Sequence, residues 1–464
     1  MTIHEEVLRS LANWGKHPAI IEIAPGKPDR LLTAADLAQD IKDLTAYLQK
    51  AGIRAGTPTA LFLENSIEFI KIFLALSSIG AVSIPLKLEY RKLELDEIFS
   101  NSHPAAVILE AYHLKMIQAY LKDLTVIIRE GGSLHVEQKG TKRIKPAEVA
   151  DDIVSLNYTY RGYGYPIAAI VPHEQYLHGV QELQNGLQAE AGQSMLYCLP
   201  MSHIFTLVGC ILVPLLNKLT GVISCTLLPR HLFRSIQEWH IENITAVPEI
   251  FSFLARLKDT SSSLRSLKAF VSGGSILDRQ QYETLKEAFT VDVLHGYGLT
   301  EFAPVCRNIR GQARAGTIGP LCRCLDARID QSDPGGVGEI VIRSPYLFRG
   351  YYRREREFRE TFHDGWFHTG DLGNFDGDHL VFVREIKKTC KVNAAIVDLE
   401  EVRRALCIDS EVEQAEVFRD GDRLAARIAL RSRPLKVEKA LSLKTALKDI
   451  VAHYKIPKEI VGLP

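Results

Sequence analysis

Residues 295–301, with the sequence His-Gly-Tyr-Gly-Leu-Thr-Glu, gather side chains that suit a nucleotide. The ring of Tyr297 can cover a flat base, the hydroxyl of Thr300 can donate to a phosphate oxygen, and Glu301 offers a hard oxygen ligand for Mg²⁺. Gly298 has no side chain, so a ligand can approach the backbone closely there. A tight turn with a surface carboxylate would use the same residues, so this segment alone leaves both interpretations open.

The surrounding elements predict how this segment is positioned. Residues 291–294 alternate like a short strand, which would place the segment at a strand end. Earlier in the chain, an apolar strand pattern at 59–63, a helical pattern at 68–79 and a strand pattern at 81–86 predict a right-handed parallel unit. The chain is therefore expected to form an α/β domain.

The pattern changes toward the end of the chain. After about residue 316 the sequence turns to short β-rich pieces separated by Gly and Pro turns. From about residue 385 two helical and two strand-like patterns follow, at 397–406, 441–454, 414–418 and 424–430. We therefore predict a large domain over 1–384 and a small α+β domain over 385–464.

The composition excludes several classes of protein. Lys plus Arg and Asp plus Glu both total 56, so the formal net charge is +0 and no basic excess indicates a nucleic-acid partner. The eight cysteines are scattered without a CxxC pair, which favours a reducing, cytoplasmic compartment. The acidic first residues do not resemble a secretion signal. The most apolar run, 204–216, is shorter than the roughly 20 residues that span a bilayer, so we expect a buried core helix there and no transmembrane segment.

A second useful carboxylate lies in residues 365–373, Gly-Trp-Phe-His-Thr-Gly-Asp-Leu-Gly. Asp371 follows a Thr-Gly turn, and its two acceptor oxygens suit the diol of a ribose. It stands about 70 residues after Glu301 and before Phe382 and Arg384. In this order the motifs resemble those of the adenylate-forming superfamily, which includes acyl-CoA synthetases, luciferases and non-ribosomal adenylation domains. Further segments that resemble family motifs are 200–203, 272–275, 338–340 and 350–352.

This resemblance implies a two-step reaction. A carboxylate would attack the α-phosphorus of ATP·Mg²⁺ to give an acyl adenylate and pyrophosphate. A thiol, from coenzyme A or a carrier protein, would then displace AMP as the small domain swings to a second orientation.

The resemblance also implies roles for single residues. Tyr297 would stack near adenine, Thr300 would contact phosphate and Glu301 would bind Mg²⁺. Asp371 and Arg384 would hold the ribose. The acyl side and its wall would contain His203, Gly273, Gly274 and Ser275. Two plainer interpretations stay open, in which His203 is a core histidine and Arg384 belongs to a surface ion pair.

One segment departs from the family pattern. Where the family has a loop of Ser, Thr and Gly that ends in Pro-Lys-Gly, residues 158–168 contain four tyrosines, and Ile167 stands at the position of the lysine. A phosphate cradle works through small residues, exposed backbone N–H groups and a point charge. Arg161 could supply a compensating charge, because its planar guanidinium suits phosphate.

A second departure lies near the end of the sequence. The family continues past a segment like Tyr454-Lys455-Ile-Pro to a Ser-Gly-Lys turn, whose lysine bridges the acyl carboxylate and the α-phosphate. The sequence stops at Pro464, so we expect a shortened small domain without this lysine. The hinge is altered too, with Asn393 and Asp398 where Gly and Pro are usual, although Asn tolerates a left-handed backbone.

Three hypotheses follow. The first, which we favour, is a divergent acyl-CoA synthetase or acyl-adenylate-forming ligase of fatty-acid type, with Arg161 or a partner subunit's lysine completing the site. The second is a pseudoenzyme that keeps an AMP or acyl-adenylate pocket and acts as a binding or scaffold protein. The third is an enzyme fragment completed by a separately encoded C-terminal piece. Loss of one preorganised charge costs roughly 3–4 kcal/mol in the transition state. We therefore expect slow adenylation, whereas thioester formation from a ready-made acyl adenylate depends less on either lysine.

Overall fold

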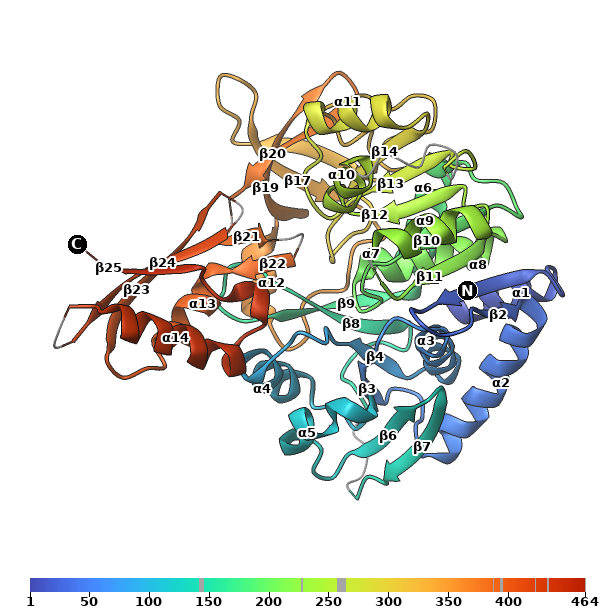
Figure 1. The fold of residues 1–464 in the computed structure, drawn as a ribbon, viewed down its shortest axis with the longest axis horizontal. Helices are drawn as coiled ribbons and strands as arrows, with labels where there is room; N and C mark the ends of the chain where they lie inside the picture. The colour runs from blue at the N-terminus through green and yellow to red at the C-terminus, as the bar shows by residue number, and fades with distance from the viewer. Residues whose placement is uncertain are drawn as a thin grey trace.

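The computed structural model describes residues 1–141, 146–226, 228–256, 264–386, 388–392, 395–421, 423–431 and 434–463. Most of the chain forms one large body, and the last part, coloured orange to red in Figure 1, forms a smaller lobe beside it. Asn393, at which we expected a turn in the hinge, lies outside the described residues.

A seven-stranded sheet contains the strand, helix and strand predicted near the start of the chain. The prediction is confirmed by β3 (Pro58–Phe62), α3 (Ile67–Ile79) and β4 (Val82–Pro85), with β3 and β4 parallel. Helix α3 begins where the side chain of Ser66 accepts a hydrogen bond from the backbone of Phe69. The other strands of this sheet are β5 (Ala106–Glu110), β6 (Thr125–Glu130), β7 (Ser133–Gln138), β8 (Ile153–Thr159) and β9 (Ile167–Pro172).

An eight-stranded sheet carries the nucleotide-like segment. The strand predicted before it is confirmed as β14 (Asp292–Tyr297), which lies parallel to β13 (Ala269–Ser272). Both strands end at the same edge of the sheet, so the loops that follow them are neighbours. The remaining strands are β1 (Pro18–Ile23), β2 (Arg30–Thr33), β10 (Ser194–Tyr197), β11 (Thr220–Ser224), β12 (Asn243–Ala246) and β15 (Cys306–Arg307).

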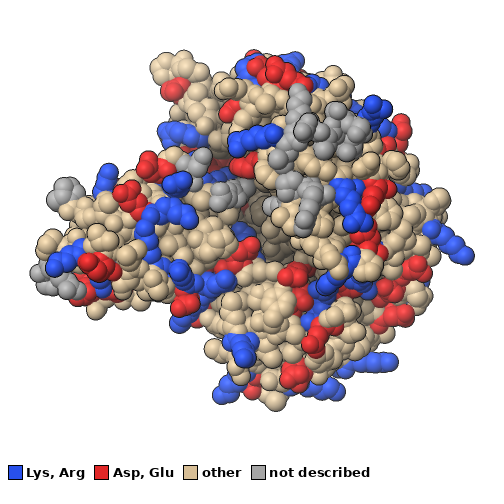
Figure 2. Space-filling model, viewed as in Figure 1, with Lys and Arg blue, Asp and Glu red and all other residues tan. Residues whose placement is uncertain are grey.

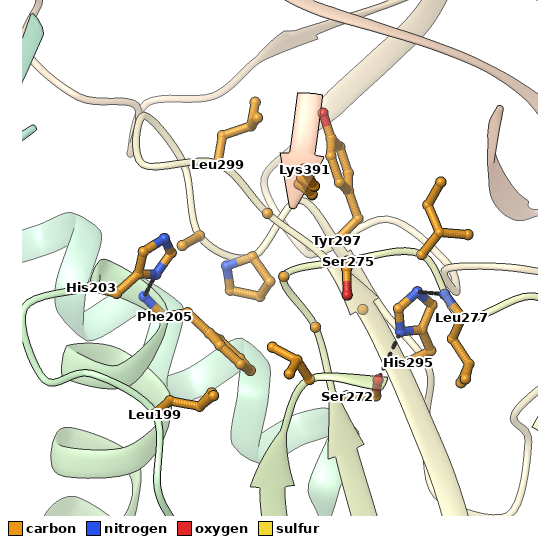
Figure 3. A pocket seen from close by; sticks show the side chains of 18 of the residues that line it. Leu199, His203, Phe205, Ser272, Ser275, Leu277, His295, Tyr297, Leu299 and Lys391 are labelled. Atoms are coloured by element: carbon orange, nitrogen blue, oxygen red, sulfur yellow. Dashed lines mark hydrogen bonds between the residues drawn. The ribbon is translucent and has the colours of Figure 1, made fainter. Parts of the chain in front are cut away.

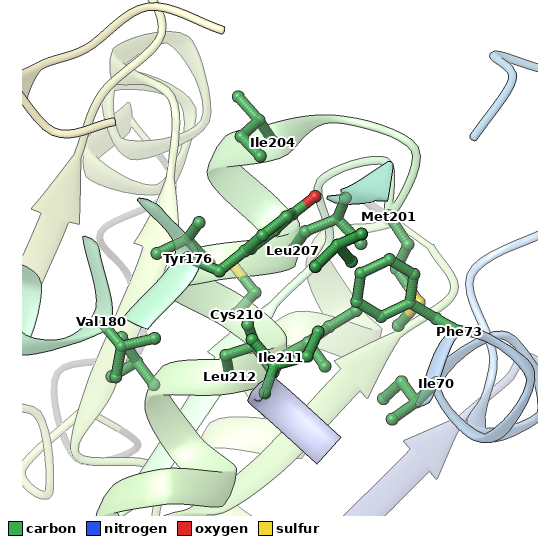
Figure 4. Close-up of a cluster of buried hydrophobic side chains, with 14 of the residues drawn as sticks. Ile70, Phe73, Tyr176, Val180, Met201, Ile204, Leu207, Cys210, Ile211 and Leu212 are labelled. Carbon is green, nitrogen blue, oxygen red and sulfur yellow. The ribbon is translucent and has the colours of Figure 1, made fainter. Parts of the chain in front are cut away.

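Helices fill the space between the two sheets. The largest buried cluster includes α3, α6 (His173–Leu187) and the apolar run predicted as a buried core helix (Figure 4). The run is buried and helical, as α7 (Ile204–Thr206), a π-helical turn (Leu207–Leu212) and α8 (Val213–Asn217). The other helices of the large body are α1 (Ile3–Ala12), α2 (Ala34–Lys50), α4 (Lys92–Ser102), α5 (Leu114–Ile117), α9 (Pro229–Glu238), α10 (Pro248–Arg256), α11 (Arg279–Ala288) and α12 (Glu355–Thr361).

The β-rich part of the chain forms a third sheet, as its Gly and Pro turns predict. Its strands are β16 (Asp326–Asp330), β17 (Gly338–Arg343), β18 (Phe362–His363), β19 (Trp366–Asp376) and β20 (His379–Glu385). Strand β19 carries the second carboxylate motif and pairs with β17, β18 and β20.

The small lobe has a hydrophobic core of its own. The two predicted helices and two predicted strands are present with shifted ends, as α13 (Leu399–Leu406), α14 (Val437–Ile450), β23 (Val412–Asp420) and β24 (Arg423–Leu430). The hairpin of β21 (Thr389–Val392) and β22 (Ala395–Asp398) precedes them, and β25 (Glu459–Gly462) follows. The domain limit at 384/385 stays a prediction. Among the helices of the described residues, none is both long and apolar enough to cross a membrane.

Candidate active site

A cavity of about 890 Å³ lies where the large body meets the small lobe. The surface is hollowed near this junction (Figure 2). The walls of the cavity include the loops after β13 and β14, part of the loop between β8 and β9, and residues of the small lobe. All but one of the site residues predicted from the sequence line it: Arg161, His203, Gly273, Gly274, Ser275, Tyr297, Gly298, Thr300, Glu301 and Asp371.

Tyr297 and Asp371 form one wall of the cavity, which we call the strand wall. Tyr297 ends β14 and Asp371 lies on β19, and the Tyr297 hydroxyl donates to Asp371 Oδ2 at 2.5 Å across 74 residues of sequence. Burial and the neighbouring Asp371 carboxylate raise the pKa of Tyr297 well above its usual value, so the hydroxyl keeps its proton. The wall thus offers a flat ring beside a buried carboxylate.

Glu301 lies deeper, with only 1% of its surface exposed. The hydroxyl of Tyr351 donates to Glu301 Oε1 at 2.5 Å, and Arg161 Nη1 lies 3.6 Å from the same oxygen. Thr300 precedes Glu301 in the loop and is also buried. The carboxylate expected to bind Mg²⁺ therefore faces a positive charge of the protein itself.

Arg161 is fixed by several contacts. Its guanidinium donates to the carbonyl oxygens of Thr369 at 3.0 Å and His368 at 2.7 Å, and lies 5.1 Å from the ring centre of Phe367. Burial opposes its charge, but Tyr351, Glu301 and Asp371 outweigh burial, and the pKa of Arg161 stays above its usual value. Arg161 is therefore a buried, permanent cation at the back of the cavity.

The opposite side of the cavity is apolar. Figure 3 shows Leu199, His203 and Phe205 facing the loop after β13, in which Gly273 lies so close that a Cβ atom would stand 3.2 Å from the Phe205 ring. His203 Nδ1 accepts a hydrogen bond from the backbone of Phe205 at 3.2 Å. Burial, helped by Lys87 and Lys391, lowers the pKa of His203 to about 3, so its ring is neutral.

The wall residues Gly274 and Ser275 follow Gly273. Gly274 has a left-handed backbone with φ of 83°, which glycine adopts at little cost. The hydroxyl of Ser275 donates to the carboxylate of Glu249 at 2.8 Å, so this hydroxyl is engaged within the protein.

Arg384 is the one predicted site residue outside the cavity lining. It is exposed on β20, paired with Leu372, while Phe382 and Glu385 line the cavity. The register between β19 and β20 shifts between Leu372 and Gly373. On a regular strand, the side chains of Phe382 and Arg384 would point to the same side of the sheet. The bulge in β20 breaks this alternation.

Two lysines that sequence reasoning did not single out line the cavity. Lys87 follows β4, and burial together with the charge of Lys455 lowers the pKa of Lys87 to about 8. Lys391 reaches in from β21 of the small lobe (Figure 3). The run of lysines in the hinge was a signal for Lys391, but its spacing did not indicate which lysine faces the site.

Residues 160–165, which we call the loop wall, contact the small lobe. The backbone N–H of Gly164 donates to Asp398 at 3.1 Å, and Arg404 donates to the Gly164 carbonyl at 2.7 Å. Lys455 of the small lobe donates to the Tyr160 hydroxyl at 2.8 Å. The segment that we compared with the family's phosphate loop therefore forms a contact between the large body and the small lobe.

Comparison with known proteins agrees with this layout. The model of the AMP-binding enzyme family matches residues 7–352. A 4-coumarate–CoA ligase of Humulus lupulus is 25% identical over 99% of this chain and 90% of its own length. The amide bond synthetase McbA of Marinactinospora thermotolerans superposes with a TM-score of 0.85 at 20% identity, over 100% of this chain and 96% of McbA. A malonyl-CoA ligase in a product complex with methylmalonyl-CoA and AMP gives a TM-score of 0.82 at 22% identity, over 98% and 99% of the two chains. With both domains of this fold and a family match over most of its length, the chain belongs to the AMP-binding, adenylate-forming enzyme family.

Proposed function

We propose that this protein is an acid–thiol ligase that handles an acyl adenylate, joining an apolar carboxylic acid to coenzyme A or a similar thiol. The observation that carries the proposal is the single cavity with two unlike ends. One end holds the Tyr297–Asp371 pair, which suits adenine and ribose, and the other is apolar around Phe205. The 4-coumarate–CoA ligase named above joins an acid to coenzyme A, which supports an acid–thiol ligase without indicating which acid it uses.

The apolar end favours a fatty or aromatic acid over an amino acid. The described side chains around it are mainly aliphatic or aromatic, among them Leu183, Leu187, Leu199, Ile204, Phe205, Val208 and Ile250. An acid with a charged or strongly polar tail would lose its hydration here without regaining enough hydrogen bonds.

In the proposed reaction, the acid's carboxylate oxygen bonds to the α-phosphorus of ATP and pyrophosphate leaves. The sulfur of a deprotonated thiol then bonds to the acyl carbon, and AMP leaves with the electrons of the broken C–O bond. Tyr297 and Asp371 hold the nucleoside, and Arg161, Lys87 and Lys391 provide positive charge within the chain. A lysine from a partner subunit, or from a separate C-terminal piece, stays a prediction.

Thioester formation, the second step, is better supported than adenylation, the first. The loop wall offers tyrosine side chains and domain contacts in place of a phosphate cradle. One missing charge costs roughly 3–4 kcal/mol, or about 10²–10³ in rate. We therefore propose that adenylation is slow and that acyl transfer from a ready-made adenylate is faster.

Two assays run side by side test this proposal. Synthetic acyl adenylates of fatty and aromatic acids are mixed with coenzyme A, and acyl-CoA is quantified by chromatography against an enzyme-free control. ATP with the same acids and labelled pyrophosphate reports exchange. We expect enzyme-dependent acyl-CoA in the first assay and weak exchange in the second. An absence of both products for every acid would overturn the ligase proposal.

A second candidate is a catalytically impaired protein that binds an adenylate and acts as a scaffold. The pairing of Arg161 with Glu301 favours it, because this pairing occupies the carboxylate expected to help bind a triphosphate. Calorimetric AMP binding without turnover in either assay would support this candidate. If there is no turnover and AMP does not bind, both the ligase proposal and the scaffold candidate are excluded.

A further inference from the structure

The residues around Glu301 do not fit a resident Mg²⁺ ion. Magnesium requires near-octahedral oxygen ligands at 2.0–2.1 Å and keeps several of its waters. Here Oε1 of Glu301 already accepts from the Tyr351 hydroxyl and faces the Arg161 guanidinium at 3.6 Å. Within the described ranges, no cluster of three or more His, Cys, Asp and Glu side chains is placed to hold a metal ion.

Arg161 cannot easily move aside for a metal. The side chain is only 5% exposed, two backbone carbonyls of β19 accept its hydrogen bonds, and the Phe367 ring lies against its face. Arginine does not lose its proton at any ordinary pH, so its charge is permanent. A divalent cation bound at Glu301 would therefore lie beside a fixed positive charge and be repelled by it.

The same position allows Arg161 to contact the phosphate of a bound adenylate. It lies in the cavity lining with Asp371 and Thr300, where the phosphate of a bound adenylate would come. A guanidinium is a good partner for phosphate oxygens, and its binding geometry is ready before the ligand arrives. The phosphate of an acyl adenylate carries one negative charge, which one arginine can balance, and the phosphate of AMP carries about −1.5 to −2 at neutral pH. A triphosphate carries more charge and normally brings Mg²⁺ with it.

We propose that Arg161 replaces the divalent cation at Glu301, so that the site binds AMP and acyl adenylates without Mg²⁺ and selects them over Mg²⁺·ATP. This inference rests on the proposed function, because it assumes that the cavity holds an adenylate. It adds a specificity-determining residue and a ligand preference to that function.

Calorimetry with the full chain tests the proposal. AMP and ATP are titrated separately in EDTA and in excess MgCl₂. We expect AMP affinity to be the same in both buffers and ATP to bind more weakly than AMP in both. Mn²⁺ serves as a second probe, because electron paramagnetic resonance detects bound Mn²⁺ directly. We expect no protein-bound Mn²⁺ signal in the presence of AMP.

The variant Arg161→Gln removes the charge and leaves a polar side chain. We expect AMP to bind about 10-fold more weakly or worse in EDTA, since a hydrogen bond to a charged group is lost. We also expect Mg²⁺ to restore part of this affinity and a Mn²⁺ signal to appear. Arg9→Gln is the matched control, because Arg9 also pairs with a glutamate, at 2.8 Å, but on the exposed face of α1. It should behave like the wild type.

The outcomes separate the two proposals. Wild-type AMP binding that requires Mg²⁺, or a Mn²⁺ signal in the wild type, would overturn the role of Arg161 and leave the ligase proposal standing. Absence of AMP binding in both buffers would instead remove the adenylate site itself. If Arg161→Gln does not fold, the wild-type titrations and the Mn²⁺ measurement still decide the question.

Discussion

The strand wall and the loop wall bound the same cavity but are held by different parts of the molecule. In the strand wall, Tyr297 and Asp371 lie on strands of two sheets of the large body and contact each other directly. In the loop wall, Tyr160 and Gly164 contact Lys455, Asp398 and Arg404 of the small lobe. A movement of the small lobe would therefore change the loop wall and leave the strand wall as it is.

Lys455 is the centre of the contact between the loop wall and the small lobe. It is completely buried, lies 2.8 Å from Glu94 Oε1 on α4 and 2.8 Å from the Tyr160 hydroxyl, and is also paired with Glu401 on α13. Burial lowers its pKa, but Glu401 and Glu94 outweigh this effect and raise it. Four polar groups from both domains thus satisfy one another in the interior.

The largest expected effect is that of Lys455→Ala. Removing the cation leaves Glu94 and Glu401 buried without their positive partner, and the loss of one member of a buried pair costs about 3–5 kcal/mol. We expect the free energy of unfolding to fall by this amount. Urea unfolding followed by circular dichroism measures it.

Lys439→Ala is the matched control for Lys455→Ala. Lys439 on α14 also pairs with two carboxylates, Asp409 at 2.7 Å and Glu411 at 2.5 Å, but at the surface of the small lobe. Such a surface pair contributes about 0–1 kcal/mol. Equal losses for the two variants would contradict the importance of the buried contact.

The next largest effect is expected in the strand wall. Asp371→Ala removes the carboxylate that we assign to the ribose, and a hydrogen bond to a charged group contributes about 1.5–3 kcal/mol. AMP should then bind about 10- to 150-fold more weakly by calorimetry. Asp376→Ala, at an exposed position of the same strand β19, should leave the affinity unchanged. Unaltered AMP binding by Asp371→Ala would show that the ribose lies elsewhere.

A smaller effect tests the packing of the loop wall. Gly164 has φ of 82°, and an added Cβ would stand 2.9 Å from Glu400 Cγ and 3.1 Å from Arg404 Cδ in the small lobe. Gly192 has φ of 89° with nothing within 4 Å of an added Cβ. Alanine at either position is strained by the left-handed backbone, so their difference isolates the contact between the domains.

We expect Gly164→Ala to lose about 1 kcal/mol more than Gly192→Ala in urea unfolding. The difference is modest because the nearest atoms belong to flexible side chains, which can shift. Losses of the same size would mean that the loop wall does not pack tightly on the small lobe.

The sequence predicted the strand wall better than the loop wall for a physical reason. The strand at 291–294 and the Thr-Gly-Asp turn are local patterns, and the resemblance to the adenylate-forming superfamily implied that Tyr297 and Asp371 serve one nucleotide. The two side chains are in direct contact in the structure. The strand and helix patterns at 59–86 likewise predicted β3, α3 and β4, because apolar periodicity reports which side of an element is buried.

The loop wall depends on contacts that no local pattern reports. The hairpin of β8 and β9 brings Arg161 against the carbonyl oxygens of Thr369 and His368, some 207 or 208 residues away in the sequence. Lys455 lies in the segment that resembles the family's Tyr-Lys-x-Pro, but this resemblance does not indicate its partners, Glu94, Tyr160 and Glu401, which come from distant parts of the chain. The family resemblance assigned Arg384 to the ribose, and the sequence does not mark the bulge in β20 that accompanies its exposed position outside the cavity lining.

The last comparison concerns pH, because His295 on the strand that ends in Tyr297 and Glu401 in the small lobe change stability with opposite signs. Burial lowers the pKa of His295 on β14 to about 4, and its Nε2 accepts from the backbone of Leu277 at 3.4 Å. Because the unfolded chain binds this proton first, the His295 contribution to stability falls as the pH drops from about 6.5 to about 4. Burial raises the pKa of Glu401 to about 7, so the folded state binds that proton first, and the Glu401 contribution rises as the pH drops from about 7 to about 4.5.

Glu401→Gln removes the Glu401 contribution to stability, which rises as the pH drops. It keeps the His295 contribution, which falls as the pH drops. We therefore expect its free energy of unfolding to decrease more steeply than that of the wild type between about pH 7 and about pH 5, by at most about 1.4 kcal/mol per pH unit. Urea unfolding at both pH values measures the slope, and Glu413→Gln at an exposed position of β23 is the control. A shallower slope in Glu401→Gln would mean that Glu401 is ionised throughout this range, and that Lys455 compensates its burial completely.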